Sequence, residues 1–170
     1  MTCEGSYVKL NTEIYGGPIL NTWLDRPLAV AGRVTLNSSD ILHPETRLVN
    51  INKPLLVIPN LAIHMNRDVN KGVELNGQKD TLPLLAQIND NLEKGNYLLS
   101  TLAAELKINS ADITDFDLFL YEFEKGSIIG LNNEFISSGR LDDLAMVHAG
   151  LEALVRTGPS EGTNVLVAFD

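Results

Sequence analysis

Two adjacent carboxylates lie at the start of the helical pattern in the segment FISSGRLDDLAMVHAGLEALV (135–155). Asp142 and Asp143 precede a run of apolar residues at helical spacing. An aspartate there commonly caps the helix, and the helix dipole stabilises its charge by roughly 0.3 to 1 kcal/mol. Capping is therefore one interpretation of the pair. Metal binding is the other, because a carboxylate held between strand ends and a helix N-terminus can bridge two divalent ions.

A further carboxylate, Asp170, follows the apolar run VLVAF (165–169). Ligands of open α/β sheets collect beyond the carboxyl ends of strands, so Asp170 is a candidate site residue, with a turn residue as the alternative. The sequence contains no HExxH, no CxxC, no pair of histidines at ligand spacing and no GxSxG. It therefore supplies neither a familiar metal motif nor a serine nucleophile.

The three histidines are predicted to lie apart. His43 is predicted to lie in a loop, and His64 in or at the end of a β segment. His148 comes six positions after Asp142 and so faces another side of the same helix, which prevents the two from sharing a metal ion.

A distinctive stretch, ILNTWLDRPLA, precedes the first long β segment. Trp23 is expected to be a core residue. Asp25 and Arg26 are expected to form an ion pair in a turn.

Composition limits the classes of protein that fit. The 170 residues carry a net charge of −9 with 13 scattered basic residues, which argues against nucleic acid as a partner. The single cysteine, Cys3, excludes an internal disulfide and a zinc ribbon and is expected to be a buried bystander. No apolar run is long enough to span a membrane and the first residues lack signal-peptide character, so a cytoplasmic location is expected.

The helices and strands that position these residues are predicted from the hydrophobic periodicity of the sequence and from its turn residues. Alternation and β-branched residues predict strands, helical spacing predicts two helices, and an Asn-, Gly- and Lys-rich loop is predicted over 66–80. The predicted strands are 7–10, 13–15, 28–36, 46–59, 110–124 and 165–169, and the predicted helices are 96–108 and 141–156. The first third is thus β-rich, and the tail from about residue 135 is typical of the beginning of an α/β domain.

Four segments carry a resemblance to a known family: YGGPILNTWLDRPLAVAGRV, KPLLVIPNLAIHMNR, EFISSGRLDDL and VAFD. In this order and at this spacing they resemble the aspartyl aminopeptidase and vacuolar aminopeptidase I family of dinuclear zinc exopeptidases, over the full length of the chain. The resemblance implies an α+β fold. Residues 1–134 would form a β-barrel-like dimerisation domain with helical additions, and residues 135–170 an incomplete α/β zinc-peptidase domain.

The resemblance also implies roles for two residues. Asp142 matches the aspartate that bridges the two zinc ions, whereas Asp143 receives no ligand role. His64 matches a histidine that reaches into the partner subunit's active site and hydrogen-bonds the scissile carbonyl or its oxyanion.

Other parts of the family pattern are missing from these residues. Relatives carry a zinc histidine in a motif before the point where this sequence begins, and a Glu-Glu pair, general base and zinc ligand, after the strand that ends at Asp170. With one zinc ligand and no base, the chain alone is expected neither to bind zinc nor to hydrolyse peptides.

The expected function is part of a zinc aminopeptidase that removes N-terminal residues, acidic or neutral, from peptides. The expected partners are a second copy in a homodimer, a dodecamer in the complete enzyme, and peptide substrates, with no nucleic acid or membrane. The alternative is a stand-alone assembly or binding module without catalytic activity.

Overall fold

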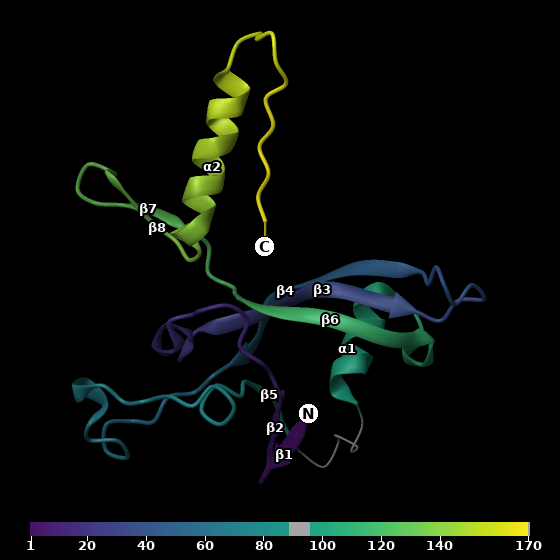
Figure 1. Ribbon diagram of the computed structural model, residues 1–170. Coiled ribbons are helices and arrows are strands. Elements are labelled where there is room, and N and C mark those ends of the chain that lie inside the picture. Colours follow the sequence, from purple (N-terminus) through teal and green to yellow (C-terminus); the bar gives the residue numbers. More distant parts are fainter. Residues whose placement is uncertain (89–95, 170) are drawn as a thin grey trace. The chain divides into compact units, whose positions relative to one another are not determined.

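The computed structural model describes residues 1–88 and 96–169, and the chain divides into two compact units, Met1–Glu124 and Lys125–Asp170 (Figure 1). The chain is rich in strands and carries two α-helices, α1 (Tyr97–Leu106) and α2 (Leu141–Arg156). The predicted α+β class is confirmed at this level, and so are both predicted helices.

The first unit is built on a curled antiparallel sheet with the strand order β1-β2-β5-β4-β3-β6 (Figure 1). Its strands are β1 (Thr2–Glu4), β2 (Tyr7–Lys9), β3 (Pro27–Leu36), β4 (Thr46–Val57), β5 (Leu84–Gln87) and β6 (Ile113–Glu122). Within the described residues, β4 and β5 meet at one pair, Val57 and Leu84. The sheet therefore consists of two three-stranded parts that share a single point of pairing.

Strand β3 is the centre of the larger part, between β4 and β6. Its alternating residues Leu28, Val30 and Val34 are almost completely buried and form the core face. Gly32 lies where β6 approaches closely, because a Cβ added there would lie 2.1 Å from the Asp117 carbonyl oxygen. The small residue is therefore required by the approach of the neighbouring backbone.

Helix α1 contributes to the same core. Its residues Leu98 and Leu102 are buried in one cluster with Val30 and Ile51. Burying a leucine side chain stabilises the fold by about 1.5 to 3 kcal/mol. The apolar face of the helix therefore holds it against the sheet. The helix ends where Lys107 adopts a left-handed conformation and its N–H donates to the carbonyl groups of the last turn.

A wide bulge interrupts the pairing of β3 with β4. Leu28 pairs with Leu56, but Val30 pairs with Ile51, so the intervening residues of β4 have no partner on β3. Pro54 lies in this bulge, where a residue without an N–H removes no hydrogen bond from the ladder.

The predictions for residues 13–15, Cys3 and residues 110–112 are wrong. Residues 13–15 form no strand, and Cys3 is exposed in β1 instead of buried. Residues 110–112 form a short 3-10 helix, η3 (Ser110–Asp112), before β6 begins. Two further 3-10 turns, η1 (Leu20–Trp23) and η2 (Val69–Lys71), lie in the connections, and η2 belongs to the loop predicted over 66–80.

The second unit consists of a hairpin of β7 (Ser127–Ile129) and β8 (Phe135–Ser137), followed by α2. Cross-strand pairs of apolar side chains occupy both faces of the hairpin: Ile128 with Ile136, and Ile129 with Phe135. All four side chains are largely exposed. A two-stranded hairpin of this kind needs further packing to be stable.

The strand predicted over 165–169 is not formed. These residues run back beside α2 without a strand partner among the described residues (Figure 1), and the Leu166 side chain packs against Gly150 of the helix. An apolar run becomes a strand only where a neighbouring strand accepts its hydrogen bonds. Asp170, predicted as a site residue, lies outside the described residues.

Candidate functional site

Asp142 lies at the entrance of α2, where the backbone is not yet helical. Its φ of −89° and ψ of 111° are extended, and Arg140 before it is left-handed with a φ of 60°. The Asp142–Asp143 peptide bond is cis. The first backbone hydrogen bond of the helix runs from Leu144 N to Arg140 O, at 3.3 Å.

The Asp142 carboxylate is exposed and forms no hydrogen bond or ion pair with the residues that the structure describes. The N-cap position belongs to Arg140, and no side chain caps the helix. The predicted capping hydrogen bond is therefore not formed, and both carboxylate oxygens remain available to a ligand. The partial positive charge of the helix N-terminus favours an anionic side chain at this place.

These residues do not complete a metal site. Among the described residues, no group of three or more His, Cys, Asp or Glu side chains is placed to hold an ion. A catalytic zinc ion needs about three protein ligands. Asp142 can supply one ligand, and the others would have to come from elsewhere.

His64 lies in an exposed turn beyond β4, not in or at the end of a strand as predicted. The turn is closed by hydrogen bonds from Met65 N and Asn66 N to Ala62 O, at 2.8 and 3.1 Å. The imidazole makes no hydrogen bond or ion pair with any described residue. His64 belongs to the first compact unit and Asp142 to the second.

The expected ion pair between Asp25 and Arg26 is wrong. Arg26 pairs with Glu122 of β6. Asp25 instead binds the segment that follows β4: its N–H donates to Ile58 O at 2.8 Å, and its Oδ1 accepts from Asn60 N at 2.9 Å. Trp23 is partly buried against the core, as predicted.

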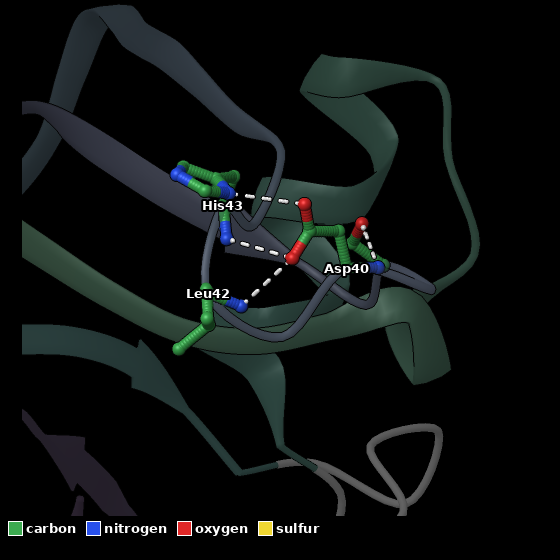
Figure 2. Close-up of polar contacts among 4 residues, drawn as sticks. Asp40, Leu42 and His43 are labelled. Carbon is green, nitrogen blue, oxygen red and sulfur yellow. Dashed lines mark hydrogen bonds and ion pairs between the residues drawn. The ribbon is translucent and has the colours of Figure 1, made fainter.

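The other two histidines belong to no site in the described residues. His43 lies in the loop between β3 and β4, as predicted, and its Nδ1 is 3.0 Å from Asp40 Oδ2 (Figure 2). Asp40 Oδ1 also accepts from the backbone N–H groups of Leu42 and His43 at 3.0 and 3.3 Å. The His43 hydrogen bond, followed by that of Leu42, lowers the pKa of the Asp40 carboxyl. His148 is exposed on α2.

No helix among the described residues is long and apolar enough to cross a membrane.

Solved proteins share this fold. The structure titled "Cryo-EM structure of the Ape4 and Nbr1 complex" superposes with a TM-score of 0.81 at 34% identity, covering 91% of this chain and 32% of that chain. A second, titled "Structure of S. cerevesiae mApe1 dodecamer", matches with a TM-score of 0.68 at 24% identity, covering 91% of this chain and 34% of its own.

The class of protein follows from the sequence of a relative. This chain is 68% identical over 170 residues to the "Probable M18 family aminopeptidase 2" of Clostridium novyi strain NT, a match that covers 100% of this chain and 39% of that relative. The chain therefore resembles an aminopeptidase, and it spans 39% of that relative's length. The sequence model described as aminopeptidase I zinc metalloprotease (M18) matches residues 2–170, and the chain belongs to this family.

Proposed function

We propose that this chain is part of a zinc-dependent aminopeptidase that removes N-terminal residues from peptides, and that it provides the dimerisation domain and a minor part of the active site. The observation that carries the proposal is the family match over residues 2–170. The free carboxylate of Asp142 at the entrance of α2 is consistent with it, because that carboxylate has no structural partner among the described residues.

In this proposal residues 1–134 form the dimerisation domain and residues 135–170 begin the catalytic domain. The curled sheet supports an assembly role because its outer face carries apolar side chains. Leu48 on β4 is 85% exposed and Phe119 on β6 is 48% exposed. A second copy would remove such surface from water, which is worth about 25 cal/mol per Å². The complete enzyme would be a homodimer that assembles further into a dodecamer.

Asp142 would be the ligand that the two zinc ions share. Zinc held there would activate water and polarise the scissile carbonyl. Asp143 has no ligand role. The remaining ligands and the general base lie outside this chain, which is therefore expected to be inactive by itself.

His64 would act in the active site of the partner subunit. Its exposed ring, without a partner among the described residues, is free to donate a hydrogen bond to the scissile carbonyl oxygen or to the oxyanion that forms from it. Losing one such donor typically lowers kcat by about 100- to 1,000-fold.

A mixing experiment tests both roles at once. In the complete enzyme, His64→Ala and Asp142→Ala are each expected to lose nearly all activity. In a mixed dimer, one active site combines Asp142 of one subunit with His64 of the other. Co-expression should therefore restore about a quarter of the wild-type activity, because about half of randomly formed dimers are mixed and each holds one complete site.

Bound zinc is the second readout of this experiment. Asp142→Ala should lower the zinc content, whereas His64→Ala should leave it unchanged. If co-expression of the two variants restored no activity, His64 would not act across the dimer interface. Full activity of His64→Ala alone would remove the residue from the mechanism.

The alternative is a stand-alone assembly or binding module without catalytic activity. The lack of a three-ligand cluster among the described residues favours it. Zinc-dependent release of N-terminal residues by a complete protein containing this chain would exclude this alternative.

A further inference from the structure

We propose that Asp25 is a positioning residue for His64, because its carboxylate fixes the segment that carries this histidine. The inference rests on the proposed function, since Asp25 affects the reaction only through His64. It concerns a residue that touches neither substrate nor metal.

The contacts of Asp25 lie at the end of β4. Leu24 pairs with Ile58 in a parallel bridge, and Asp25 N donates to Ile58 O at 2.8 Å. Asp25 Oδ1 then accepts from Asn60 N at 2.9 Å. The backbone between these two points belongs to Pro59, which has no N–H to donate. The carboxylate of Asp25 therefore accepts a hydrogen bond from the first backbone N–H group after Ile58, that of Asn60.

Beyond Asn60, the hydrogen bonds of the described turn around His64 are local. Asn60 Oδ1 accepts from Leu61 N at 2.8 Å, and the turn around His64 closes on Ala62. These bonds shape the turn but do not fix it to the sheet. His64 follows Asn60 by four positions, a length of chain that spans at most roughly 13 Å when extended. Releasing Asn60 would let the imidazole move over distances far larger than a hydrogen bond tolerates.

The residue type at position 25 fits this role in two ways. Its φ of 58° lies in the left-handed region, which aspartate, asparagine and glycine tolerate better than other residues. Its charged carboxylate makes a stronger acceptor for an N–H group than a neutral oxygen. Asp25→Asn keeps both the backbone preference and an acceptor, whereas Asp25→Gly keeps the backbone preference and removes the acceptor.

This pair of variants gives the test, carried out on the complete enzyme that contains this chain. Asp25→Gly is expected to lower kcat by about 5- to 20-fold, the effect of one hydrogen bond, with KM changed by less than about 2-fold. The effect falls on kcat because His64 would stabilise the oxyanion of the transition state. Asp25→Asn should stay within about 2-fold of the wild type.

Asp40→Gly is the matched control. It removes another exposed carboxylate that accepts from backbone N–H groups in a loop, and it should leave kcat and KM unchanged. Thermal melting and sedimentation of each variant show that it folds and dimerises. If Asp25→Gly does not fold, Asn60→Pro removes the donor of the same hydrogen bond and should lower kcat at least as much, because it also removes the bond from Leu61 N to Asn60 Oδ1.

The decisive measurement combines Asp25→Gly with His64→Ala. If Asp25 acts through His64, adding Asp25→Gly to the His64→Ala variant lowers kcat by less than about 2-fold further, because coupled residues are not additive. A further 5- to 20-fold loss of kcat when Asp25→Gly is added to His64→Ala would overturn the inference while leaving the role of His64 intact. Full activity of His64→Ala would instead overturn the proposed function.

Discussion

At the scale of single residues, one carboxylate organises the loop between β3 and β4. Asp40 accepts hydrogen bonds from two backbone N–H groups and from the His43 ring (Figure 2). The ring contact is the largest cause of the lowered pKa of Asp40, relative to its ordinary value of 3.8. Because the pKa is lower in the folded chain than in the unfolded chain, this interaction stabilises the loop above pH 3.8 and is lost as the pH falls through the folded pKa.

Removal of the ring should reverse this shift. His43→Ala is expected to raise the pKa of Asp40 toward its ordinary value, measured as the midpoint of the Asp40 carboxyl signal in a ¹³C NMR titration. His148→Ala, which removes an exposed histidine far along the sequence, is the control and should leave the midpoint unchanged. An unchanged midpoint in His43→Ala would show that the backbone N–H groups alone determine the pKa.

The sequence points to the candidate residues but not to the contacts that support them. Asp142 and His64 are recognisable because each stands in a short family segment that can be read along the chain. Asp25 stands in such a segment too, but the spacing suggests a pair with its neighbour Arg26. Its actual partner, Asn60, lies 35 residues away, and only the folded sheet brings the two together. Local sequence carries no information on such a contact.

At the scale of elements, the approach of β6 to β3 gives a test of packing. A Cβ at Gly32 would lie 2.1 Å from Asp117 O and 2.8 Å from Leu118 Cα, both backbone atoms. Gly32→Ala should therefore force the strands apart and lower the free energy of unfolding by about 1 to 3 kcal/mol, measured by urea denaturation. Gly17→Ala is the matched control, because no atom lies within 4 Å of the added methyl group, and it should change stability by less than about 0.5 kcal/mol.

Elements with a strong internal period are predicted correctly, whereas elements defined by distant partners are not. The helical stripe predicts α1, and alternation predicts β3 and most of β4 and β6. Strand β5 escapes prediction because it exists through its pairing with β2, 75 to 80 residues earlier in the chain, and β1 escapes because it has only 3 residues. Residues 165–169 have the composition of a strand but form none, since no partner strand is present among the described residues.

At the scale of the whole molecule, the exposed apolar side chains of the outer sheet face argue for association. Sedimentation velocity of this chain at micromolar concentration is expected to show a dimer, with the same sedimentation coefficient in zinc and in chelator. The reason is that the proposed interface belongs to the sheet and contains no metal. A monomer under both conditions would contradict the dimerisation role, and a dimer that forms only with zinc would indicate a metal site involving Asp142.

The position of β6 in the sequence has a consequence for synthesis on the ribosome. Strands β3 and β4 are neighbours in the chain and can pair as soon as Val57 has emerged, but β3 completes its other edge with β6, which starts at Ile113. At about 5 to 20 residues per second, the roughly 55 intervening residues take about 3 to 11 seconds to translate. During that time the nascent hairpin presents an unpaired edge beside Leu28, Val30 and Val34. A chaperone that covers nascent chains would be needed most in this interval.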